Sequence, residues 1–399
     1  MKLAAGEAEA LLRAGWAALQ RGDPAEARTA FERLVEAGIA NPQVLLLLAL
    51  ACRNGGDPEA EEQTLDRLLA SEPGSLRGLI GKGDCRARAG DDRAATSFYK
   101  AAMATGAAAR ELPADVAADL ERIRSFCDRT GQLFRDHLLD SLARSGFGDE
   151  QRSERFQQSL DIMFGEKRIF LQEPTGYYFP GLPQIQFYDR ASFPWLAAVE
   201  SATDGIRDEI EALLADSDAF RPYLVSGTDR PQFNVHGLLD NPDWSTLYLW
   251  ENGGPVEANV ERCPRTMAAL SEVPLPHITT RAPAIFFSRL SPGARIPPHH
   301  GMLNARLICH LPLIVPEGCG LRVGNETRRW EVGKALIFDD TIEHEAWNED
   351  EEDRIVLIFD IWRPELTEEE RRSVTAVFEA VDSYGAEGPN PGAGFGPNA

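Results

Sequence analysis

The stretch Arg354-Ile355-Val356-Leu357-Ile358-Phe359 is a basic residue followed by an apolar run, and it closes a series of such runs. From Ala284 onward, short apolar runs separated by Pro, Gly and Asn replace the helical periodicity of the preceding chain. Runs of this length and spacing predict the strands of a β sandwich or closed barrel. We predict a jelly roll with its core at residues 284–363, built from Ile285–Leu290, Ala305–Val315, Gly320–Val323, Ala335–Phe338 and Ile355–Ile361.

Two histidines lie in ordered polar contexts within this region. His299 belongs to Pro297-Pro298-His299-His300-Gly301, and His344 ends Phe338-Asp339-Asp340-Thr341-Ile342-Glu343-His344. Imidazole is a good ligand for ferrous iron, and two histidines on neighbouring strands leave several coordination positions open. Because Arg354 follows His344 by ten residues, the pattern predicts a metal site with a dicarboxylate beside it, as in an iron oxygenase.

The usual two-histidine iron site adds a carboxylate two residues after the first histidine, and here that position is Gly301. The third ligand is therefore not local, unless Asp339 or Asp340 reaches the site or holds a metal-bound water. Both are candidates to orient a histidine or a water, and the alternative is that one of them caps the turn. His300 is expected to be an exposed neighbour, because adjacent residues on a strand face opposite ways.

The segment from Phe287 to Leu366 resembles the catalytic core of the aspartyl/asparaginyl beta-hydroxylase family, which consists of iron(II)- and 2-oxoglutarate-dependent oxygenases. The resemblance implies a double-stranded β-helix (jelly-roll, cupin-like) domain with flanking helices, Fe(2+) as the metal, and 2-oxoglutarate and dioxygen as co-substrates. The motifs that carry it are Phe179-Pro180-Gly181-Leu182-Pro183, Phe193-Pro194-Trp195-Leu196, Ser291-Pro292-Gly293, Pro298-His299-His300-Gly301, Asn325-Glu326-Thr327-Arg328, Trp330-Glu331-Val332-Gly333-Lys334, Phe338-Asp339-Asp340, Glu343-His344-Glu345 and Trp362-Arg363-Pro364-Glu365-Leu366-Thr367.

The resemblance also implies a role for individual residues. His299 and His344 match the iron-binding histidines of the family. Arg354 matches the arginine that pairs with the distal carboxylate of 2-oxoglutarate, with Ser288 beside it, and His310 matches a residue near the proximal carboxylate. A guanidinium can hold a carboxylate through two parallel hydrogen bonds, which a lysine could not reproduce.

One position departs from the family pattern. The second arginine of its Arg-x-Arg-x-His strand is Ile308 here, while Arg306 remains. Because side chains alternate along a strand, Arg306, Ile308 and His310 share one face. Loss of the middle cation removes a charge partner from either the co-substrate or the substrate, so we predict a substrate different from that of the animal enzymes. The alternative is that Arg306, a candidate substrate-binding residue, covers both duties.

The first hundred residues contain an internal repeat with a period of 34 residues. The repeat resembles the tetratricopeptide repeat, and it predicts three units, each a helix, a Gly-Asp turn and a second helix, with small residues facing large ones between the helices. The concave face of such a stack would bind a peptide, and the alternative is a spacer or dimerisation arm. The recurring turns are Gly22–Ala27, Gly56–Glu61 and Gly90–Ala95; the small residues are Gly15, Ala49 and Gly83, and the large ones Phe31, Leu65 and Tyr99.

These patterns predict a multidomain chain of α and β structure. Residues 1–118 are expected to form the tetratricopeptide-like solenoid, residues 119–155 a helical connector, and residues 156–383 the oxygenase domain. Within that domain the segment Trp195–Leu214 reads as one amphipathic helix, and a last short helix begins at Glu368. Residues 384–399, rich in Gly and Pro, are expected to be a disordered tail.

The composition excludes several classes of partner. Lys and Arg total 41 against 63 Asp and Glu, which gives a net charge of −22 in 399 residues. Such a surface repels phosphate backbones, so we expect no nucleic-acid partner. No stretch approaches the roughly 18 apolar residues of a membrane span. The six cysteines form no Cys-x-x-Cys pair, which indicates free thiols in a reducing compartment, and we expect a cytoplasmic location.

The predicted function is a 2-oxoglutarate-dependent dioxygenase that hydroxylates an Asp- or Asn-type side chain of a peptide or protein, similar to a peptide-aspartate beta-dioxygenase. The repeats would help to hold that partner. One alternative is the same chemistry on a small molecule or a lipid acyl chain. Others are a non-catalytic repeat protein with a degenerate cupin, and a zinc-binding cupin with hydrolytic or isomerase chemistry.

Overall fold

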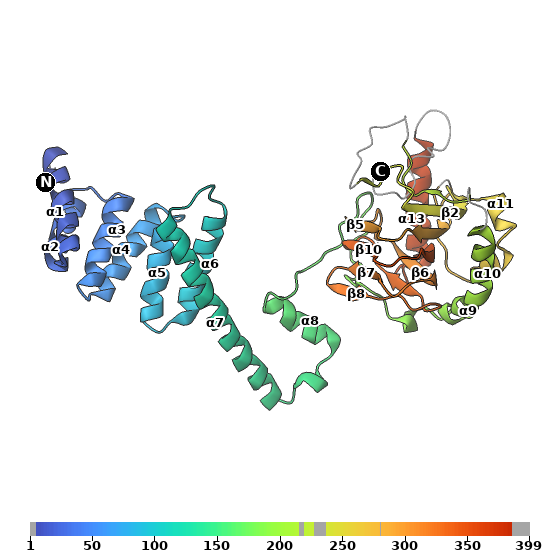
Figure 1. Cartoon of the computed structure of the whole chain (residues 1–399), viewed down its shortest axis with the longest axis horizontal. Helices are drawn as coiled ribbons and strands as arrows, with labels where there is room; N and C mark the ends of the chain where they lie inside the picture. The colour runs from blue at the N-terminus through green and yellow to red at the C-terminus, as the bar shows by residue number, and fades with distance from the viewer. Residues whose placement is uncertain (1–4, 215–218, 227–236, 280, 385–399) are drawn as a thin grey trace. The chain divides into compact units, whose positions relative to one another are not determined.

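The computed structural model describes residues 5–214, 219–226, 237–279 and 281–384 (Figure 1). The chain divides into two compact units, residues 1–164 and residues 165–399, which are described separately. The domain limits expected at residues 118, 155 and 383 stay a prediction. Of the predicted tail, residues 385–399 lie outside the described part of the chain.

The first unit is helical throughout and contains the predicted repeats. Each repeat is a pair of antiparallel helices, and the second helix of each pair begins at an aspartate whose side chain accepts a hydrogen bond from the backbone amide three residues on. These N-caps follow glycines with positive φ angles, which only glycine adopts without strain. The helices are α1 (Ala5–Arg21), α2 (Pro24–Glu36), α3 (Pro42–Asn54), α4 (Pro58–Ser71), α5 (Leu76–Arg88), α6 (Asp92–Ala107), α7 (Ala114–Arg144), the short η1 (Asp149–Gln151) and α8 (Glu154–Met163).

Small residues face large ones between the paired helices, as the repeat predicts. Gly15 of α1 lies against the ring of Phe31, so that a Cβ at this position would come within 2.6 Å of the ring. Gly83 of α5 lies even closer to the ring of Tyr99, whose side chain is fully buried. The absence of a Cβ therefore sets how closely the two helices of a repeat approach.

Replacing Gly83 with alanine is expected to destabilise the helical unit by about 2 kcal/mol, because the added methyl group overlaps a buried ring that has no space to move. Gly131→Ala is the matched control, since Gly131 lies within α7 with nothing near the added Cβ. That change should stabilise the helix by about 0.5–1 kcal/mol. Thermal unfolding followed by far-ultraviolet circular dichroism measures both, and equal effects of the two substitutions would contradict the packing account.

The second unit contains two antiparallel β sheets among its described residues. The larger has the strand order β1-β2-β4-β11-β6-β9, with β3 paired to β2, and the smaller has the order β5-β10-β7-β8. Their bounds are β1 (Arg221–Pro222), β2 (Trp244–Glu251), β3 (Gly254–Pro255), β4 (Ile285–Leu290), β5 (Arg295–His299), β6 (Arg306–Ile314), β7 (Cys319–Val323), β8 (Glu326–Arg328), β9 (Leu336–Phe338), β10 (His344–Asn348) and β11 (Arg354–Trp362).

The five predicted apolar runs correspond to β4, β6, β7, β9 and β11. The sheet-rich class of the second unit is therefore confirmed, while the jelly roll stays a prediction. Strands β1, β2, β3, β5, β8 and β10 have no counterpart among those runs.

The helices of the second unit differ from the sequence prediction at one place. The segment expected as a single helix forms α9 (Leu196–Ser201) and α10 (Thr203–Leu214), so that prediction was wrong. At the break, the amide of Ala202 donates a hydrogen bond to the carbonyl of Val199, and the hydroxyl of Thr203 donates one to the carbonyl of Glu200. Both bonds span three residues and compete with the regular helical bonds. The others are η2 (Arg190–Ser192), α11 (Glu257–Val260), α12 (Pro264–Ala269) and α13 (Glu368–Ser383).

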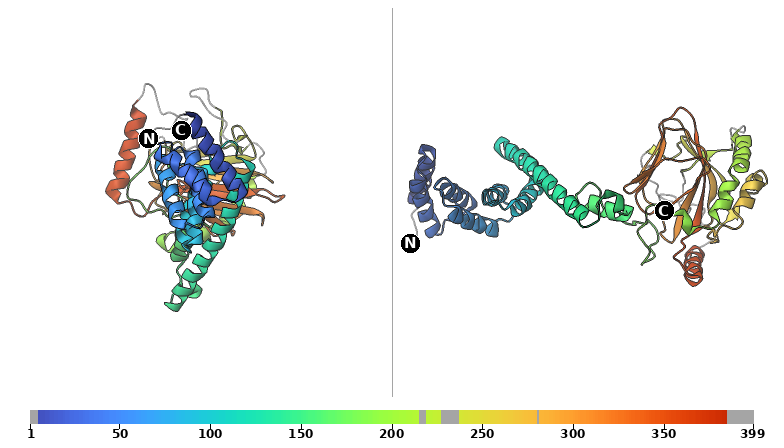
Figure 2. Two further views of the ribbon diagram at one scale, coloured as in Figure 1. Left: turned by 90° about the vertical axis from the view of Figure 1, so that its left-hand side faces the viewer. Right: turned by 90° about the horizontal axis from the view of Figure 1, so that it is seen from below.

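Strand β11 is buried along its whole length and separates the main core from a pocket. Its odd-numbered residues from Ile355 to Ile361 pack into an apolar core with α9 and α10. Its even-numbered residues Arg354, Ile358 and Asp360 line the pocket, because successive side chains of a strand point to opposite faces. Figure 2 shows the helices of this unit, in green and yellow, along one side of the strands. Among the described residues, no helix has the length and apolarity to cross a membrane.

Candidate active site

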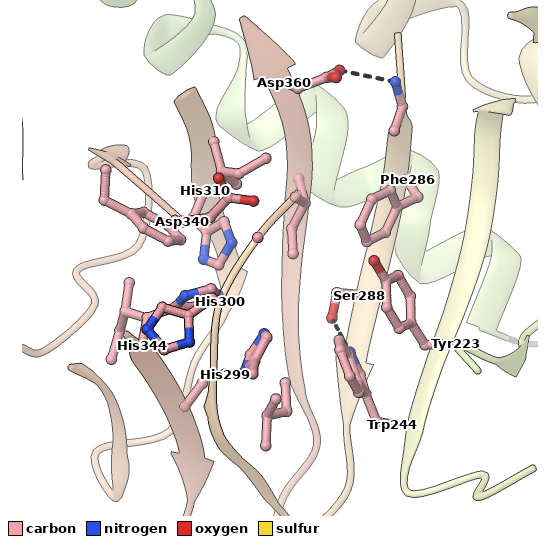
Figure 3. Close-up of a pocket in the computed structure, with 18 of the residues that line it drawn as sticks. Tyr223, Trp244, Phe286, Ser288, His299, His300, His310, Asp340, His344 and Asp360 are labelled. Atoms are coloured by element: carbon pink, nitrogen blue, oxygen red, sulfur yellow. Dashed lines mark hydrogen bonds between the residues drawn. The ribbon is translucent and has the colours of Figure 1, made fainter. Parts of the chain in front are cut away.

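A pocket in the second unit is lined by both sheets and contains most of the predicted site residues (Figure 3). His299 and His344 come from β5 and β10 of the smaller sheet, and the larger sheet faces them across the pocket. The larger sheet contributes Ser288 from β4, Arg306, Ile308 and His310 from β6, and Arg354 from β11. Since the three β6 residues all line the pocket, their predicted common face is confirmed.

The two histidines lie directly opposite each other on paired strands. His344 is the register partner of His299, and their ring centroids are 4.0 Å apart. The Nδ1 atom of His299 lies 2.8 Å from the carbonyl oxygen of Pro297, and that of His344 lies 3.1 Å from the carbonyl of Ile342. Because a carbonyl oxygen only accepts, Nδ1 carries the proton in both rings, and Nε2 carries the lone pair.

This arrangement suits metal binding. A histidine that binds a metal through one nitrogen usually donates its other N–H to a carbonyl or carboxylate, which fixes the tautomer and the ring orientation. Burial and the neighbouring His299 lower the pKa of His344 well below its usual value, so the ring is neutral. His344 is therefore a neutral imidazole with a fixed tautomer, and the ring of its strand partner His299 is oriented by the same kind of bond to a carbonyl.

Gly301 and Asp340 meet where the usual carboxylate ligand would lie. A Cβ added to Gly301 would overlap the carboxylate of Asp340. The backbone amide of Gly301 also donates a hydrogen bond of 2.6 Å to the backbone carbonyl of Asp340. The carboxylate accepts a hydrogen bond of 3.1 Å from Arg306, and its Oδ1 has no hydrogen-bond partner within the described chain. Burial raises the pKa of Asp340 to about 6. Asp340 thus fills the space that a side chain at position 301 would need.

The substitution Gly301→Ala is expected to lower activity by more than about 10-fold, because the methyl group displaces Asp340 from beside the histidines. Gly254→Ala serves as the control in the same unit, since a Cβ there meets nothing within 4 Å. Steady-state assays on the two folded variants check the prediction. Wild-type turnover in the Gly301 variant would show that this close approach has no role.

The closed end of the pocket contains a buried cation. Arg354 is 1% exposed, and its Nη2 donates to Ser288 Oγ at 2.9 Å while its guanidinium lies 5.1 Å from the ring centre of Trp330. Its Nε has no hydrogen-bond partner, and the described residues offer it no ion pair. Burial lowers the pKa of Arg354 to about 10. A buried charge without a counterion is unfavourable, so this end of the pocket fits an anionic group.

Ser288 is oriented as a donor toward the same space. Its Oγ accepts from Arg354 and also from the indole Nε1 of Trp244 at 3.3 Å. Both partners are donors only, so the hydroxyl proton of Ser288 must point elsewhere. Trp244 itself is held by stacking on Tyr223, with ring centres 4.1 Å apart. His310 adds a buried Nδ1 without a partner, and burial together with Arg354 lowers its pKa well below the usual value.

Each of the two units matches a known protein family. Residues 200–364 match the family model described as aspartyl/asparaginyl beta-hydroxylase, and residues 12–75 match a tetratricopeptide repeat model. Residues 200–364 are an aspartyl/asparaginyl beta-hydroxylase domain. The beta-hydroxylase domain follows a region of tetratricopeptide repeats, as the sequence predicts.

Two relatives illustrate the range of this family. The ornithine lipid ester-linked acyl 2-hydroxylase of Rhizobium tropici is 38% identical over 180 residues, which cover 44% of this chain and 60% of that protein. The aspartyl/asparaginyl beta-hydroxylase of Mus musculus is 43% identical over 143 residues, covering 35% of this chain and 19% of that protein. The matches thus span 60% of the first relative and about a fifth of the second.

Among solved structures, the Sgt2 tetratricopeptide-repeat domain from Aspergillus fumigatus aligns with a TM-score of 0.28 and 18% identity. The alignment covers 32% of this chain and 82% of that one.

Asp339 lies outside the pocket lining of the beta-hydroxylase domain. It is fully buried and forms an ion pair with Arg363, and it accepts hydrogen bonds from Gln172 at 2.7 Å and from the amide of Thr341 at 3.0 Å. Its carboxylate therefore holds the turn between β9 and β10. His300 lies partly buried in the pocket lining, so the prediction of an exposed neighbour was wrong. Strand β5 ends at His299, and the alternation of faces stops there.

Among the pocket residues that the sequence prediction did not include, three bear on the chemistry of the site. Trp244 belongs to β2, Tyr223 directly follows β1, and Asp360 belongs to β11. The run Trp244–Glu251 is rich in aromatic and β-branched residues, a signal that could have identified β2. Asp360 stands six residues after Arg354, and the period of two along a strand places both on one face.

A metal would find two protein ligands here. Among residues 5–214, 219–226, 237–279 and 281–384, no group of three or more His, Cys, Asp or Glu side chains is arranged to hold a metal ion. The pair of His299 and His344 is smaller than such a group, and it would leave further coordination positions to other ligands.

Proposed function

We propose that this chain is an iron(II)- and 2-oxoglutarate-dependent dioxygenase whose site lies in a jelly-roll domain. The observation that carries the proposal is the combination, in one pocket, of two imidazoles oriented by backbone carbonyls and a buried guanidinium with an unused donor. His299 and His344 would hold the iron through their Nε2 atoms. Arg354 would take the distal carboxylate of 2-oxoglutarate at the closed end of the pocket.

The remaining pocket residues would position the co-substrate and exclude water. Ser288 donates its hydroxyl proton to the carboxylate held by Arg354, and His310 offers its buried Nδ1 near the other end of the molecule. Phe286 and Ile358 close the wall between the charged groups. When bound, iron(II) and 2-oxoglutarate supply the reduction of dioxygen, in which one oxygen atom becomes the new hydroxyl group and the other enters succinate as carbon dioxide leaves.

The proposed substrate is an Asp- or Asn-type side chain of a peptide or protein. The family match and the helical repeats support it, since the repeats offer a groove lined by Trp16, Leu47, Leu50, Arg53 and Ile80 on the first unit. Such a groove would take a segment of the protein partner, and we expect the reaction in the cytoplasm. In this proposal the repeats end at residue 118, and a helical connector up to residue 155 joins them to the oxygenase domain.

An acyl chain is the second candidate substrate, because Ile308 replaces a family arginine and makes this part of the pocket wall apolar. The relative from Rhizobium tropici is named as an acyl 2-hydroxylase. The 2-position of an acyl chain and the β-carbon of an aspartyl residue both lie next to a carbonyl carbon. The two candidates therefore present the same kind of C–H bond to the site.

The test is aerobic incubation of the purified chain with iron(II), 2-oxoglutarate and two sets of candidates, peptides containing Asp or Asn and acyl lipids. Succinate release and a mass gain of one oxygen in one set would support the proposal and identify the substrate class. A protein that binds iron but never releases succinate would instead be an interaction protein with a degenerate cupin. Turnover with zinc and without oxygen would indicate hydrolytic or isomerase chemistry.

The variant Trp244→Phe is expected to raise the KM for 2-oxoglutarate about five-fold with little change in kcat, because one neutral hydrogen bond that orients Ser288 is lost. The phenyl ring keeps the stacking on Tyr223. In Ser288→Ala the same tryptophan substitution should have no further effect, since the group it orients is already gone. Additive effects of the two substitutions on KM would contradict this arrangement.

A further inference from the structure

Asp360 presents an unused acceptor at the end of the pocket opposite Ser288 (Figure 3). Its side chain is 1% exposed and lines the pocket. Oδ1 accepts the backbone amide of Ala284 at 2.9 Å, whereas Oδ2 has no hydrogen-bond partner within the described residues. A buried acceptor without a hydrogen bond is destabilising, so a ligand that donates a hydrogen bond to this oxygen would be stabilised by it.

Ile308 lies beside this carboxylate. It is the register partner of Asp360 across β6 and β11, and it stands where the family pattern has an arginine. The isoleucine offers no donor, and the neighbouring pocket residues Phe286 and Ile358 are apolar too. Apart from Arg306, the pocket wall beside Oδ2 is therefore apolar.

The charges at this end of the pocket sum to an excess of acid. Arg306 donates to Asp340 at 3.1 Å, and it forms a longer ion pair with Asp360, whose Oδ2 lies 3.9 Å from its Nε, beyond hydrogen-bonding distance. One guanidinium thus faces two carboxylates. Burial raises the pKa of Asp360, and the nearby Arg306 offsets only part of that rise.

The acidic end of the pocket lies beside partly exposed residues. Ala284 and Ile308, the two neighbours of Asp360, are partly exposed, whereas Ser288 and Arg354 at the other end are fully buried. A dicarboxylate held by Arg354 would occupy the closed end. A second molecule that binds afterwards would be left with the end of the pocket that contains Asp360.

We propose that Asp360 is a specificity-determining residue that binds a primary ammonium group of the substrate. The inference rests on the proposed function, since that function fills the Arg354 end of the pocket with 2-oxoglutarate and leaves the other end to the substrate. The ammonium group would donate to Oδ2 and neutralise the excess carboxylate. The methylene groups next to it would pack on Phe286, Ile308 and Ile358.

Binding of simple probes to the full chain tests this proposal. The chain is loaded with zinc(II), which supports no turnover of a dioxygenase, and saturated with 2-oxoglutarate so that Arg354 is occupied. Dissociation constants of hexylammonium and 1-hexanol are then measured by ligand-observed NMR. We expect hexylammonium to bind about ten-fold more tightly, since a hydrogen bond to a charged group adds this much to the apolar contacts that both share. Equal binding would overturn the proposal.

Two substitutions locate the effect. Asp360→Asn keeps the acceptor for the Ala284 amide and should reduce hexylammonium binding to the level of 1-hexanol, leaving 1-hexanol unchanged. Ile308→Arg should place a guanidinium beside Asp360, abolish the preference for hexylammonium and favour hexanoate. Wild-type affinity for hexylammonium in both variants would exclude Asp360 as the receptor. If only one variant folds, the other decides the question.

The same samples separate this inference from the proposed function. Binding of 2-oxoglutarate is measured first in each variant. A chain that ignores 2-oxoglutarate but binds hexylammonium through Asp360 would retain the ammonium subsite and lose the proposed dioxygenase function. A chain that binds 2-oxoglutarate and shows no preference for hexylammonium would remain consistent with the proposed dioxygenase function and would contradict the ammonium subsite.

Discussion

Replacing either His299 or His344 with alanine is expected to abolish succinate release, with a loss of more than about 100-fold. Loss of a residue that merely orients a metal-bound histidine commonly costs 10–100-fold, and here one of two protein ligands disappears. Each ring is oriented by its own bond from Nδ1 to a backbone carbonyl and would supply one ligand, so neither can substitute for the other. The measurement is succinate formation in the presence of iron(II) and 2-oxoglutarate.

His137→Ala is the control for this pair, because His137 is an exposed residue of α7 in the first unit. It should retain wild-type turnover and iron content. Full activity in either the His299 or the His344 variant would refute the assignment of these residues as ligands.

The substitution Arg354→Met is expected to raise the KM for 2-oxoglutarate about 100-fold, because truncating one partner of a buried charge pair costs about 2–5 kcal/mol. Methionine fills most of the volume without the charge. The chain should be no less stable than the wild type, since the substitution removes a buried cation that has no counterion in the described structure. A large rise in KM without a loss of thermal stability is thus the signature of a co-substrate residue.

Arg289→Met provides the matched control from the same sheet. Arg289 lies on β4 opposite Ile355 in the register, on the face away from the pocket, and is partly exposed. It should leave the KM unchanged. An Arg354 variant with an unaltered KM and a lowered melting temperature would show that the guanidinium is structural.

Much of the larger sheet could be predicted because its strands are apolar runs bounded by turn residues. Strands β4, β6 and β11 each give such a run, and alternation along β6 correctly placed Arg306, Ile308 and His310 on one face. The prediction that His299 and His344 lie on neighbouring strands is confirmed by their direct pairing. Their role as iron ligands stays a prediction.

Contacts between distant segments could not be predicted from local pattern. The indole of Trp244 reaches Ser288 only because β2 pairs with β4, and nothing in either strand specifies its partner. The overlap between Gly301 and Asp340 likewise depends on how the smaller sheet meets the turn after β9. Sequence spacing gives the face of a residue within one strand, but register and sheet packing decide which side chains meet.

The different roles of Asp339 and Asp340 also could not be predicted from local sequence. The two residues are adjacent in sequence and were equal candidates for the site. Asp339 forms an ion pair with Arg363 and accepts a hydrogen bond from Gln172, two residues distant from it in sequence, whereas Asp340 faces the pocket. Only the tertiary partners distinguish a turn-holding carboxylate from one beside the histidines.

The central claim is that two imidazoles alone anchor a catalytic iron beside a co-substrate held by Arg354. Anaerobic titration of the full chain with iron(II), followed by 2-oxoglutarate, tests it by calorimetry without requiring the substrate. The account predicts one iron per chain, tighter 2-oxoglutarate binding once iron is present, and loss of iron binding in His299→Ala and His344→Ala. Retention of one tightly bound iron per chain in both histidine variants would contradict it.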